Sequence, residues 1–184
     1  MNDHERLVAL LAERSAKRGK FNLSSGREST MYIDARLTTM SPEGQATIGP
    51  LALARLKSEG LAPDSVGGLT LGADPVSYAI AYASALAGIP IRAFTVRKEA
   101  KSHGTGQLIE GPFKATDRVV IIEDVITTGG SALRAVAAVR ATGAKVLGVL
   151  AVVDREEGGR EAIAAEGLRV LCLATGSEIM ARVP

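Results

Sequence analysis

Apolar residues along the chain alternate between short continuous runs and a helical pattern. Continuous runs predict strands at 65–70, 89–96, 118–122, 145–153 and 168–173. Between them, apolar residues recur at helical spacing, which predicts helices over 74–86, 130–142 and 156–166. Strands that alternate with helices predict an α/β fold with a parallel, Rossmann-like sheet and helices on both faces. Strands without polar alternation fit a sheet that is covered on both sides.

The N-terminal third has a different pattern. The apolar residues Leu7, Val8, Leu10 and Leu11, set among charges, predict an amphipathic helix over 3–18 that ends at Gly19. A Ser/Gly turn between two short apolar segments predicts a pair of strands within 21–35. A hydroxyl followed by proline at Ser41 predicts the start of a helix that runs to about residue 59, with a kink at Pro50.

Composition limits the class of protein. The chain has 184 residues, of which 46% are hydrophobic and 23% charged, so we expect one domain over 1–184 with a full core. The net charge is +2 and the cations are interleaved with acids, which argues against a nucleic-acid partner. A single cysteine excludes an internal disulfide, and neither a signal sequence nor a membrane-spanning apolar run is visible. We therefore expect a cytoplasmic protein without a membrane partner.

Ligands of such sheets bind beyond the C-terminal ends of the strands. This rule selects the segments 70–75, 97–111, 123–131 and 154–159 as the candidate site.

The segment 119–131 combines two chemistries. A buried strand ends in Glu123 and Asp124, and a loop of hydroxyls and glycines at 127–131 leads into a helix. Glycines and a helix N-terminus present N–H groups to an anion, and threonine and serine hydroxyls add donors, so the loop suits a phosphate. The carboxylates repel phosphate but accept hydrogen bonds from sugar hydroxyls. Together they fit a ribose 5-phosphate, whereas a Walker loop is excluded because no Gly-Lys-Ser/Thr follows.

This segment resembles the phosphoribosyl-pyrophosphate signature of the type I phosphoribosyltransferases. The resemblance implies a substrate with a ribose 5-phosphate and a 1-pyrophosphate, and Mg²⁺ held mainly by that substrate rather than directly by the protein. It also implies Asp124 as a catalytic residue. The substrate-binding residues implied here are Glu123, Asp124, Val125, Ile126, Thr127, Thr128, Gly129, Gly130 and Ser131.

The loop 97–111 is rich in cations. From composition it is either a solvated surface loop or a lid that closes over a polyanion and excludes water. Its order, Arg-Lys-x-x-Lys-x-His-Gly, resembles the catalytic loop of the orotate phosphoribosyltransferases. The resemblance implies that Arg97, Lys98, Lys101 and His103 contact pyrophosphate, with Lys101 and His103 catalytic. It also implies a homodimer in which loop 97–111 is shared across subunits.

A third segment indicates the acceptor. Arg155 offers a planar fork for a carboxylate, although it could instead pair with a neighbouring glutamate on the surface. The string Asp-Arg-Glu-Glu-Gly-Gly at 154–159 resembles the orotate-binding element of the same family, which implies that Arg155 and Thr127 bind orotate.

The N-terminal segment carries a further resemblance to this family. The pattern over 21–34 is similar to that of a small hood, mainly 19–40, that covers the base. Ser24 stands where many members of the family have a lysine. Some members have a second lysine shortly after the loop 71–75, where this chain has Val76 and Ser77. Two basic contacts of some relatives are therefore missing here.

These resemblances imply that orotate and phosphoribosyl pyrophosphate give orotidine 5′-monophosphate and pyrophosphate, a step of pyrimidine (UMP) biosynthesis. One alternative is a purine phosphoribosyltransferase, which would need an aromatic to stack on the base, whereas aromatic residues make up only 3% of this chain. Another is a regulatory protein that binds the sugar ligand without turnover, which would be expected to lose the basic loop or to gain a DNA-binding segment.

Overall fold

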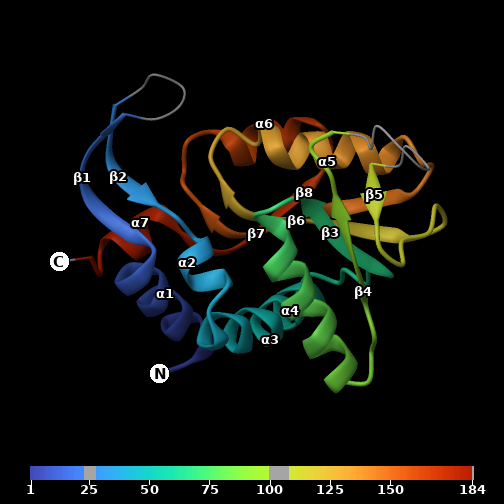
Figure 1. The fold of residues 1–184 in the computed structure, drawn as a ribbon, viewed down its shortest axis with the longest axis horizontal. Coiled ribbons are helices and arrows are strands. Elements are labelled where there is room, and N and C mark those ends of the chain that lie inside the picture. Colours follow the sequence, from blue (N-terminus) through green and yellow to red (C-terminus); the bar gives the residue numbers. More distant parts are fainter. Residues whose placement is uncertain (23–27, 100–107, 184) are drawn as a thin grey trace.

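A six-stranded sheet forms the centre of the part of the chain that the computed structural model describes, residues 1–22, 28–99 and 108–183 (Figure 1). The strands are β3 (Ser65–Leu69), β4 (Arg92–Val96), β5 (Ile109–Glu110), β6 (Arg118–Ile126), β7 (Lys145–Asp154) and β8 (Arg169–Thr175), in the order β5-β4-β3-β6-β7-β8. All neighbours are parallel except β5, which pairs antiparallel with β4. The predicted parallel α/β sheet is confirmed.

Helices cover both faces of this sheet (Figure 1). They are α1 (Asp3–Arg14), α2 (Arg36–Thr39), α3 (Pro42–Ser58), α4 (Ala73–Leu86), α5 (Gly130–Arg140), α6 (Gly159–Ala165) and α7 (Gly176–Met180). Strand β6 shows why two layers are needed. Val120 and Ile122 point into a core shared with α1, α3 and α4, while Val119 and Ile121 point into a second core with α5 and α6. None of the helices in the described ranges is long and apolar enough to cross a bilayer.

Residues 16–22 and 28–33 form a hairpin that is separate from the central sheet. Helix α1 ends at Arg14 rather than near Gly19, because β1 (Ala16–Asn22) already pairs antiparallel with β2 (Glu28–Ile33). Ala16 lies opposite Ile33 and both are buried, so a tertiary contact outweighs the local helical pattern. The two strands were predicted, but they are longer than expected, and the short helix α2 after them was not predicted.

Several predicted boundaries were wrong by a few residues. Strand β6 continues to Ile126 instead of ending at residue 122, because it keeps pairing with β7 as far as Asp154. Helix α6 begins at Gly159 rather than at 156, since Glu156 and Gly158 have positive φ values of 61° and 88°. The segment 97–112 contains the short strand β5, and β4 begins only at Arg92.

The helix predicted after Ser41 is confirmed. The Ser41 hydroxyl accepts a hydrogen bond from the backbone N–H of Gly44 at 3.1 Å, and Pro42 occupies the first turn, where its missing N–H costs nothing. Pro50 lies within α3, and the helix continues past it to Ser58. This helix packs against α4 and carries one side of the core.

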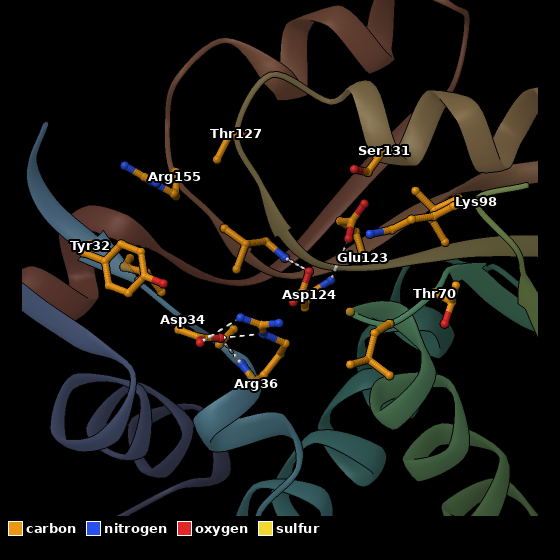
Figure 2. A pocket seen from close by; sticks show the side chains of 16 residues that line it. Tyr32, Asp34, Arg36, Thr70, Lys98, Glu123, Asp124, Thr127, Ser131 and Arg155 are labelled. Carbon is orange, nitrogen blue, oxygen red and sulfur yellow. Dashed lines mark hydrogen bonds and ion pairs between the residues drawn. The ribbon is translucent and has the colours of Figure 1, made fainter. Parts of the chain in front are cut away.

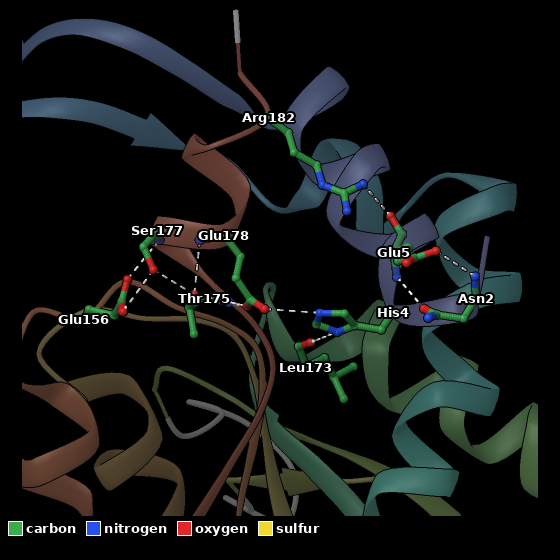
Figure 3. Close-up of polar contacts among 9 residues, drawn as sticks. All are labelled: Asn2, His4, Glu5, Glu156, Leu173, Thr175, Ser177, Glu178 and Arg182. Carbon is green, nitrogen blue, oxygen red and sulfur yellow. Dashed lines mark hydrogen bonds and ion pairs between the residues drawn. The ribbon is translucent and has the colours of Figure 1, made fainter.

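Polar contacts tie the two ends of the described chain together (Figure 3). The ring of His4 lies 3.0 Å from the carbonyl oxygen of Leu173 through Nδ1 and 3.2 Å from Oε1 of Glu178 through Nε2. The guanidinium of Arg182 donates to the carbonyl oxygen of Glu5 at 3.3 Å. Helix α1 is thereby fixed to α7 and to the C-terminal end of β8.

Candidate functional site

A cavity of about 330 Å³ lies at the C-terminal ends of the central strands (Figure 2). Its walls come from the end of β2, the start of α2, the loop between β3 and α4, the end of β6 and the loops that follow β4, β6 and β7. The lining residues are Tyr32, Ile33, Asp34, Ala35, Arg36, Leu69, Thr70, Leu71, Gly72, Lys98, Glu123, Asp124, Val125, Thr127, Ser131 and Arg155. The end of the sheet that the sequence predicted is therefore the end that holds the cavity.

The loop between β3 and α4 is held tightly against β6. The carboxylate of Asp74, which is 8% exposed, accepts hydrogen bonds from the hydroxyls of Thr70 at 2.7 Å and Thr95 at 2.8 Å. A Cβ atom at Gly72 would lie 2.5 Å from Oδ1 of Asp124. Only glycine therefore lets the loop approach this carboxylate so closely, and the peptide bond between Thr70 and Leu71 is cis.

The two acids of β6 differ in environment. Glu123 is 5% exposed, and its Oε1 accepts a hydrogen bond from the backbone N–H of Asp124 at 3.3 Å. Burial raises the pKa of Glu123 to about 9, together with a side-chain hydrogen bond to Asp124 and the charge of Asp124, so this carboxyl is protonated at neutral pH. The side chain of Asp124 accepts from the backbone N–H of Val125 at 2.8 Å and is less buried. The pair thus offers a sugar one neutral and one charged carboxyl group.

The loop after β6 is shaped for an anion. Gly129 has φ 82° and forms the N-cap of α5, whose N-terminal dipole favours negative charge. A Cβ at Gly159 would lie 2.7 Å from the backbone nitrogen of Gly129, so this glycine allows α6 to support the loop from behind. Thr127 and Ser131 face the cavity and can donate hydroxyl hydrogens to a phosphate.

Arg155 follows β7 and lies beside the start of this loop. It is 6% exposed, its backbone N–H donates to the carbonyl of Ile126 at 2.9 Å, and its Nη2 lies 2.6 Å from Oε1 of Glu157. The pairing with a neighbouring glutamate that the sequence left open is present, but Arg155 is buried and Glu157 half-buried, so the pair does not lie fully on the surface. Arg155 also lines the cavity, as a carboxylate-binding residue must.

The hairpin and α2 add residues that the sequence did not assign to the site. Tyr32 and Asp34 were noted only as part of the N-terminal pattern, and Arg36 was missed. Arg36 donates from Nε to Oδ1 of Asp34 at 2.8 Å and from Nη2 to Oδ2 at 2.9 Å. The hydrogen bonds from Arg36 lower the pKa of Asp34. One signal in the sequence could have indicated Arg36: it follows Asp34 by two residues, at the end of a predicted strand and within the predicted hood.

Not every predicted site residue reaches the cavity. Those that line it are Lys98, Glu123, Asp124, Val125, Thr127, Ser131 and Arg155. Those that do not are Arg97, Ile126, Thr128, Gly129 and Gly130. Arg97 instead lies 3.9 Å from the carboxylate of Glu110 on β5. Ser24, Lys101 and His103 lie outside the described residues.

Comparisons with known proteins identify the family of this chain. A family model for the phosphoribosyl transferase domain matches residues 57–181. The chain is 49% identical over 183 residues to an orotate phosphoribosyltransferase of Aquifex aeolicus, covering 98% of this chain and 99% of that protein.

Solved structures give the same picture. The crystal structure of the Mycobacterium tuberculosis H37Rv orotate phosphoribosyltransferase in complex with Fe(III) dicitrate aligns with a TM-score of 0.83 at 46% identity, covering 97% of this chain and 99% of that one. A structure of the Mycobacterium tuberculosis enzyme in complex with 5-phospho-α-D-ribosyl 1-diphosphate aligns with a TM-score of 0.81 at 43% identity, again covering 97% and 99%.

Proposed function

The chain belongs to the orotate phosphoribosyltransferase family, and from that premise we propose how its residues bind and convert the substrates. The reaction transfers a phosphoribosyl group from 5-phosphoribosyl 1-pyrophosphate to orotate in pyrimidine biosynthesis. Its products are orotidine 5′-monophosphate and pyrophosphate. The enzyme is therefore a pentosyltransferase with small-molecule substrates.

A single observation carries the assignment of the binding residues. The carboxyl pair of β6, the hydroxyls of Thr127 and Ser131, and the guanidinium of Arg155 all line one cavity. The 5′-phosphate binds to the loop 127–131, and the ribose hydroxyls bind to Glu123 and Asp124. Orotate lies between Arg155, which accommodates its carboxylate, and Thr127.

Catalysis then rests on positioning and on stabilising the leaving group. The bond between ribose C1 and pyrophosphate breaks, and an orotate ring nitrogen forms the new bond through an oxocarbenium-like state. Asp124 orients the ribose, while Arg97, Lys98, Lys101 and His103 contact the departing pyrophosphate. A protein nucleophile is not required, because the orotate ring nitrogen itself attacks C1, and the proton of that nitrogen passes to the departing pyrophosphate.

Mg²⁺ fits this arrangement as a cation held mainly by the substrate. Within the described ranges, no group of three or more potential metal-binding side chains is present. Mg²⁺ typically binds through one or two carboxylates together with substrate phosphates and water, and Asp124 is available in the cavity. When bound, the ion would neutralise charge on the pyrophosphate.

The active enzyme is a homodimer in the cytoplasm, built from single-domain subunits that share loop 97–111. An apolar stripe on α4 supports a dimer, because Tyr78, Tyr82 and Leu86 are 52%, 70% and 73% exposed and share one helix face. Exposed apolar patches of this kind mark interfaces. Light scattering of the purified chain tests this, and a monomer in the presence of both substrates would contradict it.

Incubation with Mg²⁺, phosphoribosyl pyrophosphate and each of orotate, uracil, adenine and guanine tests the substrate assignment. We expect nucleotide formation with orotate alone. Turnover with a purine base would indicate a purine phosphoribosyltransferase, and binding without any turnover would indicate a regulatory protein.

A pair of variants links this activity to the cavity. Asp124→Asn should lose turnover, because it removes the charged acceptor for the ribose hydroxyls. Asp64→Asn is the matched control, since Asp64 holds Arg118 at the opposite end of the sheet. Equal turnover in the two variants would contradict the site.

A further inference from the structure

Arg36 enters the cavity from the N-terminal hairpin side. It is the first residue of α2 and lines the cavity next to Asp34. Figure 2 shows its guanidinium beside Asp34 and facing Asp124. Both side-chain bonds to Asp34 use Nε and Nη2, so Nη1 can donate to a ligand. The arginine is therefore oriented before any ligand binds.

Few cations line the described part of this cavity. They are Arg36, Lys98 and Arg155. Arg155 is buried against Glu157, on the side where orotate is assigned. The loop 70–75 has the sequence Thr-Leu-Gly-Ala-Asp-Pro and brings no cation of its own. Arg36 and Lys98 thus supply the positive charge near this loop.

The shape of the substrate places its two phosphate groups on different sides. In phosphoribosyl pyrophosphate the 1-pyrophosphate is attached to C1 and the 5′-phosphate is attached through C5 to C4, and these two ring carbons flank the ring oxygen. With the 5′-phosphate on loop 127–131 and the hydroxyls on the β6 acids, the pyrophosphate must lie away from that loop. Figure 2 shows Arg36 and Thr127 on opposite sides of Asp124, and the backbone of Gly72 also lies close to this carboxylate.

We propose that Arg36, held in place by Asp34, binds the pyrophosphate of the substrate and stabilises it as the leaving group. The inference rests on the proposed function, and it assigns to the enzyme a pyrophosphate-binding residue outside the loop 97–111. Asp34 acts as a positioning residue, because both of its oxygens accept from the same guanidinium. Arginine suits this role because its planar fork can bind Asp34 on one edge and a phosphate on the other.

A purely structural ion pair is the competing explanation. In that case Arg36 would only fix the start of α2, where its backbone N–H also donates to Asp34 at 3.2 Å. Its removal would then lower stability and weaken all ligands alike. Binding of pyrophosphate and of the nucleotide product, measured separately, distinguishes the two roles, because orotidine 5′-monophosphate has a 5′-phosphate but no pyrophosphate.

The experiment is titration calorimetry of Mg²⁺-pyrophosphate and of orotidine 5′-monophosphate into the wild type, Arg36→Gln and Arg36→Lys. For Arg36→Gln we expect pyrophosphate affinity to fall roughly tenfold to a hundredfold, as for loss of a charge-assisted hydrogen bond, with nucleotide affinity within about twofold. Arg36→Lys should recover part of the loss, since it keeps the charge without the fork. It also remains a test if Arg36→Gln does not fold.

Arg14→Gln is the matched control, because Arg14 pairs with Glu43 outside the cavity. Unchanged pyrophosphate affinity in Arg36→Gln, or equal losses for both ligands, would overturn the inference and leave the proposed function standing. A wild type that binds neither ligand would instead overturn the proposed function.

Discussion

Replacement of Gly72 by alanine separates the geometry of the site from the stability of the fold. A Cβ at this position would lie 2.5 Å from Oδ1, 2.6 Å from Cγ and 2.7 Å from Oδ2 of Asp124. Carbon atoms at optimal separation lie about 3.5–4.0 Å apart, so the carboxylate must move by about 1 Å. Misplacement of a reacting group by about 1 Å costs on the order of a hundredfold in rate, or roughly 2.7 kcal/mol of barrier.

The same substitution should not weaken the fold. Gly72 has φ −62° and ψ −43°, a right-handed helical conformation that alanine adopts without strain. Replacing glycine by alanine at such a position stabilises by about 0.4–1 kcal/mol, through the unfolded chain. The atoms that must yield belong to the end of a side chain, which can rotate at little cost. We therefore expect Gly72→Ala to reduce kcat about a hundredfold while its free energy of unfolding stays the same or rises.

The assay compares kcat and denaturant unfolding of Gly72→Ala with those of Gly60→Ala. Gly60 has φ 68° and no atom within 4 Å of its Cβ position, so alanine there is strained but contacts nothing. That control should lose about 1–2 kcal/mol of stability and keep its kcat. A Gly72→Ala enzyme with kcat within threefold of the wild type would refute the reasoning, because the position of the Asp124 carboxylate would then not limit the reaction.

Three further predictions address other groups. Burial raises the pKa of Glu123, so in the folded protein this residue keeps a proton that it loses in the unfolded chain. The stability that this group contributes is present below about pH 4.5 and is lost as the pH rises towards about 9. The free energy of unfolding of Glu123→Gln should therefore rise relative to that of the wild type as pH increases through that window. Urea unfolding at several pH values measures this, with Glu13→Gln as the control. A difference between variant and wild type that stays constant with pH would contradict the prediction. Arg155→Lys should raise the KM for orotate roughly tenfold or more and leave that for phosphoribosyl pyrophosphate nearly unchanged, since lysine lacks the fork; equal changes in steady-state kinetics would refute the assignment. Lys101→Ala should slow turnover far more than it weakens orotate binding, and comparable losses would count against a role at the leaving group.

The fold and half of the site could be predicted because their signals are local. Continuous apolar runs predicted five of the six strands of the central sheet, all but β5, and the order acid, acid, hydroxyl, glycine along 123–131 is contiguous in the chain. Parallel strands bring their C-terminal ends to one edge, so Arg155 after β7 necessarily approaches the loop after β6. This is why the residues proposed to bind ribose, phosphate and orotate could be predicted to lie together without a structure.

The other half of the site depends on distant contacts that no local pattern records. Arg36 faces Asp124 only because the hairpin β1–β2 delivers α2 to the mouth of the cavity. The hairpin itself begins at Ala16, where charges continue the helical pattern of α1. The extension of β6 to Ile126 likewise comes from pairing with β7. Tertiary pairing decided these features, and it overrides local propensity.

The charges around the cavity explain how two acids can stand beside a polyanion. In the described part of the wall, Asp34, Glu123 and Asp124 face Arg36, Lys98 and Arg155, which would sum to zero if all were ionised. Because Glu123 is protonated at neutral pH, the wall instead carries an excess of one positive charge. The neutral carboxyl can still donate and accept hydrogen bonds with a ribose hydroxyl. The negative charges that remain in this wall are those of Asp34 and Asp124. Arg36 pairs with Asp34 and faces Asp124, next to the position proposed for the pyrophosphate. Burial of Glu123 in β6 thus removes the repulsion that a fully ionised acid pair would exert on the substrate.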